Sequence, residues 1–142
     1  MEMNKTQNEI IVEFEEFVDW MDKYDYLIEL SKDLPEIDPQ YKNDNYVISG
    51  CQSKVWLYAE LIDGKIIYTA DSDAIIVKGI VALLVRVMSG HTPQDLMKTD
   101  LFFIDKIGLK QNLSPTRSNG LLAMIKQMKL YAIAFNAKQN QK

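Results

Sequence analysis

The fold is decided by one continuous stretch, residues 55–89, which reads VWLYAELIDGKIIYTADSDAIIVKGIVALLVRVMS. Asp63-Gly64 separates two β-prone runs in it, and glycine accepts the positive φ that a two-residue hairpin turn needs. The first run covers 55–62 and alternates along the chain, although both of its sides are largely apolar. The second run, 65–70, is the expected return strand. We therefore expect an antiparallel hairpin.

The second half of the same stretch predicts a buried helix. Asp71, Ser72 and Asp73 carry side-chain oxygens of the kind that cap helices, and they stand just before an apolar run. From about Ala74 to Ser89 the residues are apolar nearly all round the helix, which is typical of a helix that is covered on most sides. We expect this helix to pack centrally on the sheet and to end at Gly90.

Upstream, a short β-prone run at Tyr46–Ile48 predicts a third antiparallel strand. Leu34–Asp44 contains two prolines and several polar residues, and it predicts a loop. Residues 9–30 predict one helix or two short ones. The apolar side chains expected on its buried face are Ile10, Phe14, Phe17, Val18, Met21, Leu27 and Ile28.

Downstream, the capping signals predict further helices. Thr92-Pro93 places a capping hydroxyl before a proline at the first helical position, and Ser114-Pro115 repeats this signal. A short helix is expected over Leu101–Ile107, stopping near Gly108. The last helix is expected to start at Ser114-Pro115 or at Ser118-Asn119 and to end at about Ala137, followed by a frayed tail over 138–142. The expected fold class is α+β: a single domain over residues 1–142, with a small three-stranded antiparallel sheet packed against several helices.

The composition excludes several classes of protein. The chain has 142 residues, of which 47% are hydrophobic and 25% charged, as is ordinary for one soluble domain. Its net charge of -4 gives no attraction to nucleic acid. The most apolar segment, residues 75–88, is too short to span a membrane and contains Lys78 and Arg86. Without a secretory pattern at its N-terminus, the protein is expected in the cytoplasm. One cysteine and one histidine are too few for a disulfide or a structural zinc site.

The cysteine is the first candidate for chemistry. Cys51 stands in the segment Ser49-Gly50-Cys51-Gln52-Ser53, between two strand runs and among small or polar neighbours. This setting favours a reactive thiol over a buried structural cysteine, and the cytoplasm keeps a lone thiol reduced. The alternative that His91 serves Cys51 as a base is weaker, because a histidine in a Gly-His-Thr-Pro turn is typically an exposed loop residue.

Arg117 is the second candidate. It lies in the first turn of an expected helix, where a cation is unfavourable to the helix dipole. That placement suggests a partner elsewhere, a carboxylate or an anion, while an ordinary surface arginine stays equally open. Met124 and Met128 are expected to face the core, and both tryptophans are assigned to packing.

Four motifs, in order, cover nearly the whole chain: WMDKYDYLIEL at 20–30 followed by Leu34-Pro35, SGCQSKVW at 49–56, DSDAIIVKG at 71–79 and LSPTRSNGL at 113–121. Together they resemble the SufE-type sulfur acceptor proteins. One departure is Asn112, where many members have histidine. The resemblance implies a compact α+β domain with the cysteine in an exposed loop.

The resemblance also implies a function. Cys51 would accept persulfide sulfur from a SufS-like cysteine desulfurase, stimulate that enzyme, and pass the sulfur to a SufBCD-like scaffold for iron-sulfur cluster assembly. Pyridoxal phosphate would belong to the desulfurase, so the chain itself is expected to bind no cofactor or metal. Gly50, Gln52 and Ser53 are expected to support the loop. Asp73 and Arg117 would lie near it and hold or release it; for Asp73, helix capping stays equally open.

Two alternative functions remain open at this point. A non-catalytic binding module of the same fold would regulate a desulfurase without carrying sulfur. A cysteine-dependent hydrolase or peroxidase would need a base or a second thiol, which a chain with one histidine and one cysteine hardly supplies. The sequence also leaves open a homodimer, and whether the partner is SufS or the sister desulfurase that the similar CsdE proteins serve.

Overall fold

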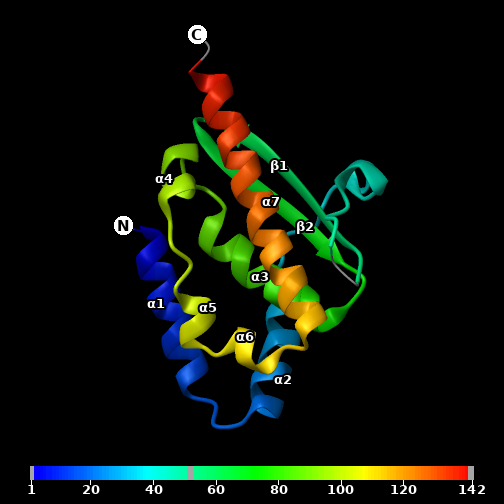
Figure 1. Ribbon diagram of the computed structural model, residues 1–142, viewed down its shortest axis with the longest axis vertical. Coiled ribbons are helices and arrows are strands. Elements are labelled where there is room, and N and C mark those ends of the chain that lie inside the picture. The colour runs from blue at the N-terminus through cyan, green and yellow to red at the C-terminus, as the bar shows by residue number, and fades with distance from the viewer. Residues whose placement is uncertain (1, 51–52, 141–142) are drawn as a thin grey trace.

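A two-stranded antiparallel hairpin and one apolar helix form the centre of the fold, and the other helices pack around them (Figure 1). The computed structural model describes residues 2–50 and 53–140. Its elements, in chain order, are α1 (Glu2–Glu15), α2 (Trp20–Ser31), the 3-10 turns η1 (Pro39–Tyr41) and η2 (Asp44–Tyr46), β1 (Val55–Ile62), β2 (Lys65–Ser72), α3 (Ile75–Met88), α4 (Pro93–Lys98), α5 (Phe103–Lys106), α6 (Leu109–Asn112) and α7 (Pro115–Gln139). The predicted α+β class is confirmed.

The hairpin has the predicted turn. The two strands pair along their whole length, from Val55 opposite Ser72 to Ile62 opposite Lys65. Asp63 and Gly64 have φ values of 52° and 79°, the left-handed pair that a two-residue turn matched to the strand twist requires. Alternate residues of both strands are buried, so one face of the hairpin lies on the core and the other is half-exposed.

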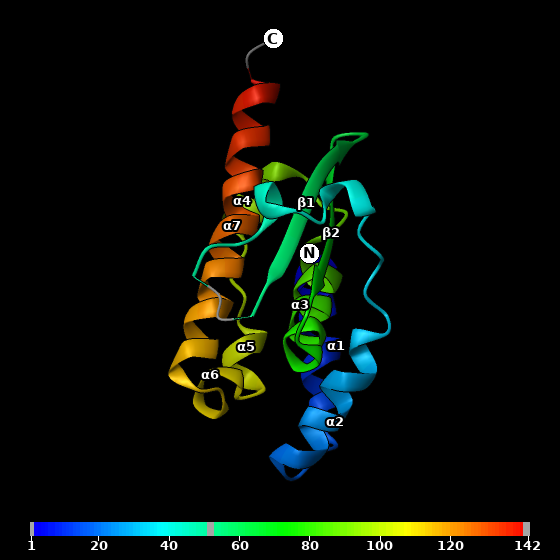
Figure 2. The same cartoon turned by 90° about the vertical axis from the view of Figure 1, so that its right-hand side faces the viewer.

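Helix α3 is the central helix, as predicted, and Gly79 sets how closely it packs. It contacts β2 on one side and α1 and α2 on the other, with most of its side chains buried (Figure 2). A Cβ at Gly79 would overlap the Leu27 carbonyl oxygen of α2 and lie 2.7 Å from the carbonyl carbon. The two helix backbones therefore meet at a point where no side chain fits.

Helix α7 runs beside the hairpin, from near α6 to the C-terminal tip of the molecule (Figure 1). It begins at Pro115, with the Ser114 side chain accepting a hydrogen bond from the Arg117 main-chain nitrogen, as the cap signal predicted. Met124 and Met128 are buried, also as predicted. The Tyr68 hydroxyl of β2 donates to the Met128 carbonyl at 2.7 Å, which joins the sheet to α7, and burial raises the pKa of Tyr68.

The predicted third strand is wrong. Of Tyr46–Ile48, Tyr46 ends the 3-10 turn η2, and Val47 makes a single isolated bridge to Trp56. The Asn43 side chain caps η2 by accepting from the Asn45 main-chain nitrogen, which curls the chain just before it could extend. The sheet in the described part of the chain therefore has two strands.

The N-terminal residues form two helices, but the predicted buried face is only partly right. Ile10, Phe14 and Leu27 are buried, whereas Val18 is 97% exposed and Met21 is 75% exposed. Asp19 accepts a hydrogen bond from the Asp22 main-chain nitrogen and starts α2 as a new helix. This break resets the helical period, and so the apolar residues on either side of it no longer share a face.

The predicted downstream helices are present with changed bounds. Thr92 caps α4 through its side chain, as expected. The helix expected over 101–107 is limited to α5, Gly108 then has a φ of 78°, and a further short helix, α6, follows. Helix α7 continues to Gln139, past the predicted end, so Lys138 belongs to it. No helix in the described ranges is long and apolar enough to cross a bilayer.

Glu13 and Arg86 connect α1 to the central helix. The Arg86 guanidinium donates to both Glu13 carboxylate oxygens, at 3.0 and 2.7 Å, and Tyr26 donates to the same carboxylate. The hydrogen bonds from Arg86, then Tyr26, lower the pKa of Glu13 against the raising effect of partial burial. Paired in this way, the carboxylate stabilises the fold more when it is ionised.

Gly79→Ala should lower the free energy of unfolding by about 1 to 3 kcal/mol, because the added methyl forces α3 away from α2. Urea titration measures this change. At an uncrowded helix position the same substitution would raise stability by up to about 1 kcal/mol. A stabilised variant would therefore contradict the close approach at Leu27.

Glu13→Gln should destabilise the protein at neutral pH and have a smaller effect in acid. The folded pKa of Glu13 lies below its ordinary value of 4.5, so its contribution is present above that pH and is lost as the pH falls through the folded pKa. Urea titrations of wild type and variant near neutral pH and near pH ~3 test this. Glu9→Gln is the matched control, because its carboxylate lies 3.8 Å from Arg86 and is more exposed. An effect of Glu13→Gln that does not depend on pH would contradict the pairing.

Candidate functional site

Three of the motifs in the sequence meet at one small pocket. The loop that precedes β1, the first turns of α3 and the first turns of α7 surround it, and its volume is about 20 Å³. Its lining residues are Ser53 from the loop, Val77 and Ile80 from α3, and Thr116, Arg117, Gly120 and Met124 from α7. A space of this size holds about one water-sized group.

Asp73 fastens the chain at the end of this loop. Its carboxylate accepts a hydrogen bond from the Lys54 main-chain nitrogen at 3.0 Å, and its own main-chain nitrogen donates to the Lys54 carbonyl at 3.2 Å. The Ser72 hydroxyl donates to that same carbonyl at 3.0 Å. The position where the loop enters β1 is thus fixed to the segment between β2 and α3.

This arrangement corrects the capping prediction for residues 71–73. The N-cap residue of α3 is Ala74, which has no side chain able to cap, and Ser72 belongs to β2. The Ser72 hydroxyl accepts from the Ala74 main-chain nitrogen, one residue before the helix. The carboxylate of Asp73 instead accepts the hydrogen bond from the Lys54 main-chain nitrogen, just before β1.

Gly50 turns the chain at the other end of the loop. Its φ of +93° lies in the left-handed region, where other residues are strained. A Cβ built on it would lie 3.5 Å from the Ala123 side chain of α7, so the loop passes close to this helix. Cys51 and Gln52, the predicted thiol and its neighbour, lie outside the described residues.

Arg117 brings a positive charge to the pocket. The residue lines the pocket together with Ser53, and it is exposed. Within residues 2–50 and 53–140 its guanidinium forms no ion pair with a carboxylate. An anion or a partner's carboxylate could therefore approach it from solvent.

A second charged group lies close by along β2. Asp71 forms ion pairs with Lys42 at 2.9 Å and Lys78 at 3.3 Å. Partial burial raises the pKa of Asp71, but the hydrogen bonds from Lys42, the Ser72 main chain and Lys78 outweigh it and lower the pKa. Lys42 also lies over the Trp56 ring, 4.9 Å from its centre, consistent with the packing role predicted for this tryptophan. These charges hold the segments beside the pocket in place.

The structure does not bring His91 to the site. The His91 carbonyl accepts from Ile66 near the start of β2, whereas Ser72 and the Lys54 contact lie at the end of that strand. Ser72 is six residue steps along the strand from Ile66, which is roughly 20 Å. His91 is half-buried rather than exposed as predicted. A base at that distance cannot serve a loop fixed at Lys54.

Asn112, where histidine was expected, has a structural role. Its side-chain amide donates to the Gly108 carbonyl at 2.9 Å, and its own carbonyl accepts from the Tyr24 hydroxyl at 2.8 Å. The residue stabilises α6 and joins it to α2. Just after it, the Ser118 hydroxyl donates to the Lys110 carbonyl, which positions the start of α7 that carries Arg117.

Sequence reasoning missed the residues that form the walls of the pocket. Val77, Ile80 and Met124 look like ordinary core residues in the sequence, and their place in the pocket depends on how α3 and α7 approach each other. Gly120 did offer a signal, because a glycine inside a helix lowers helix stability and commonly marks a close approach. It is buried in the pocket wall.

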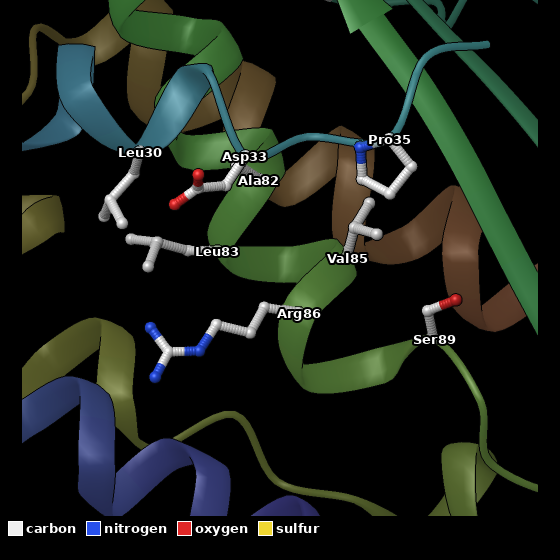
Figure 3. A pocket seen from close by; sticks show the side chains of 8 residues that line it. All are labelled: Leu30, Asp33, Pro35, Ala82, Leu83, Val85, Arg86 and Ser89. Carbon is white, nitrogen blue, oxygen red and sulfur yellow. The ribbon is translucent and has the colours of Figure 1, made fainter.

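A larger pocket of 420 Å³ lies toward the opposite end of α3 (Figure 3). In the figure, the Asp33 carboxylate and the Arg86 guanidinium lie on either side of Leu83. Arg86 is already paired with Glu13, and none of the residues lining this pocket belongs to the candidate site. In the described ranges, no group of three histidine, cysteine or acidic side chains is placed to hold a metal ion.

A solved structure has the same fold. The solution structure of a hypothetical protein from Thermus thermophilus superimposes with a TM-score of 0.74 over 91% of this chain and 94% of that one. The two sequences are 19% identical. At this identity the likeness shows the fold alone.

A family model provides the assignment. The model described as SufE, Fe-S metabolism associated domain, matches residues 8–132. The match includes the loop, both Asp73 and Arg117, and all of α2, α3 and the hairpin. The resemblance seen in the sequence motifs is thereby confirmed, and the chain belongs to the SufE family.

Proposed function

We propose that this chain carries sulfur on Cys51. It accepts the sulfur from a pyridoxal-phosphate-dependent cysteine desulfurase of the SufS type, stimulates that enzyme, and delivers the sulfur to a SufBCD-like scaffold. Membership of a family associated with Fe-S metabolism supports this role most strongly. The pocket adds support, because it gathers three separate motifs around the ends of the loop that contains the cysteine.

The transfer needs one thiolate and no bound group. The Cys51 thiolate attacks the terminal sulfur of the donor's persulfide, a new sulfur-sulfur bond forms on Cys51, and the bond in the donor breaks. The donor cysteine leaves as a thiolate with the electron pair of that bond. The proton of the terminal sulfur stays on it, and no external oxidant or reductant takes part. We propose accordingly that the chain binds no cofactor of its own.

A single cysteine suits a carrier. A second thiol nearby could attack the persulfide, form a disulfide and release sulfide, which would lose the cargo. The chain has one cysteine in all, so this side reaction within the molecule is excluded. The cytoplasm keeps such a thiol reduced between cycles, and we propose that the protein works there.

The neighbours of Cys51 are proposed to place it and to favour its charged forms. Gly50 provides the turn into the loop, and Asp73 holds the loop's other end at Lys54. Ser53 and Arg117 both line the pocket, and the guanidinium there would stabilise a thiolate or persulfide anion. Gln52, for which the structure provides no geometry, is proposed to serve the loop through hydrogen bonds.

Intact-mass measurement tests the proposal directly. The reduced protein, mixed with a SufS-type desulfurase and cysteine, should gain the mass of at least one sulfur atom, mapped by peptide analysis to Cys51. Cys51→Ser should gain none while its thermal unfolding stays close to wild type. If the Ser variant still stimulates the desulfurase fully, the chain is a regulatory binding module and the carrier role is wrong.

Asp73→Ala should loosen the loop and speed sulfur transfer severalfold. The substitution removes the acceptor for the Lys54 main-chain nitrogen, and a loop that reaches into the partner's active site then loses one restraint. Hydrogen exchange at the Lys54 amide should become faster along with transfer. Asp73→Asn keeps an acceptor oxygen and should stay near wild type in both measurements. If Ala and Asn behave alike, the carboxylate acts through its charge and not through this hydrogen bond.

A further inference from the structure

The outer edge of β1 is unpaired near the hairpin turn. On β2, the Ile66 main-chain nitrogen donates to the His91 carbonyl, and the Ile66 carbonyl accepts from Gly90, so both groups point away from β1. Directly opposed residues of an antiparallel pair either bond each other or both point outward. Leu61, opposite Ile66, therefore directs its N–H and C=O to the free edge of β1.

The same orientation holds for Ala59, two residues earlier. Its partner Tyr68 donates its main-chain N–H to the Ser89 hydroxyl, again away from β1. At the far end of β1, the Val55 carbonyl accepts a hydrogen bond from the Ile48 main-chain nitrogen across this outer edge. This bond shows independently that every second residue from Val55 directs its main-chain groups outward. No residue in the described ranges forms a hydrogen bond with the outward main-chain groups of Ala59 or Leu61.

A groove of 550 Å³ runs along this free edge. The β1 edge and the hairpin turn form one wall and the C-terminal end of α7 forms the other; the lining residues are Tyr58, Ala59, Glu60, Leu61, Asp63, Gly64, Phe135, Lys138 and Gln139. Figure 2 shows the chain around η2 crossing in front of β1 below the hairpin turn, so η2 does not reach the part of β1 that lines the groove. The groove thus continues the line along which Val47 makes its one bridge to β1.

We propose that an extended peptide segment of a partner protein binds in this groove as a third strand. Unpaired N–H and C=O groups at a strand edge bind another extended chain, and four such groups are available at Ala59 and Leu61. The peptide residues that pair with Ala59 and Leu61 would place their side chains on the α7 side, next to Phe135, and apolar side chains suit that position. The residue between them lies on the outer face beside Glu60, which is exposed, and is basic.

The position of helix α7 favours a peptide over a second copy of the chain as the occupant of the groove. It runs beside the groove, with Phe135 and Lys138 in the opposite wall, so a single extended segment fits where the edge of another sheet would meet the helix. The inference concerns a surface remote from the thiol loop. It does not depend on sulfur transfer, and its test needs no desulfurase.

Hydrogen exchange and a defined peptide test the proposal on the full chain. In the free protein, the amides of Ala59 and Leu61 should exchange faster than those of Tyr58 and Glu60, which point to β2. A labelled peptide, acetyl-Thr-Val-Lys-Val-Thr-amide, should bind and slow exchange at Ala59 and Leu61. Methylating the two valine nitrogens should weaken binding roughly tenfold or more, because these N–H groups donate to β1.

Matched variants locate the binding. Leu61→Pro removes one outward N–H but leaves the pairing to β2, and it should weaken binding roughly fivefold, whereas Leu61→Val should not. Glu60→Lys should weaken the lysine peptide and favour one with glutamate at that position. The proposal is overturned if the methylated peptide binds as tightly as the unmethylated one, or if neither the lysine nor the glutamate peptide binds. It is also overturned if the Ala59 and Leu61 amides are already protected in the free protein. Protection that increases with protein concentration would also overturn it and indicate a second copy.

Discussion

The contact between Gly79 and the Leu27 carbonyl is the constraint on which the rest of the structure depends. At this point the backbones of α2 and α3 touch, and no other residue offers so small a surface. Helix α3 is covered on one side by α1 and α2 and on the other by β2. Its position therefore sets where the hairpin lies, and the N-terminal end of α3 also carries Val77 and Ile80 into the pocket. Packing remote from the loop thus determines the shape of the site beneath it.

The hairpin in turn sets the position of the loop that precedes β1. Its turn fixes a register in which Val55 faces Ser72, and a shift by one residue would expose the whole buried face. The same register brings Lys54 opposite the end of β2, within reach of Ser72 and Asp73. The loop is thereby held at its exit by three hydrogen bonds, while Gly50 bends the chain at its start. These hydrogen bonds and the turn at Gly50 fix both ends of the segment that is proposed to meet the desulfurase.

Much of the fold was predictable because its signals are local. The Asp63-Gly64 turn, the apolar α3 and the Ser114 cap each depend on a few neighbouring residues, and all three are confirmed. The errors arose where another interaction competes: Asn43 curls the predicted third strand, and Asp19 restarts the helix that would have buried Val18. For the site, the sequence motifs suggested Asp73 and Arg117, and the structure places the first beside Lys54 and the second in the pocket wall. The hydrogen bond of Asp73 to Lys54 depends on strand register, and the pocket walls depend on helix packing, neither of which can be derived from local sequence.

The Thermus thermophilus protein shares the fold at only 19% identity, which shows that the buried core tolerates many different sequences. The core formed by α3, the hairpin and the helices around them requires apolar residues of suitable size at buried positions, and many sequences satisfy that requirement. Transfer of a sulfur atom between thiols needs a reactive thiol and access to it, without a metal or a bound cofactor. The proposed chemistry would therefore constrain few side chains, and its larger requirement would be a loop presented at a fixed place with a cation nearby. The contacts of Gly50, Lys54 and Arg117 meet that requirement, and each depends on α3 or α7 being where the core puts it.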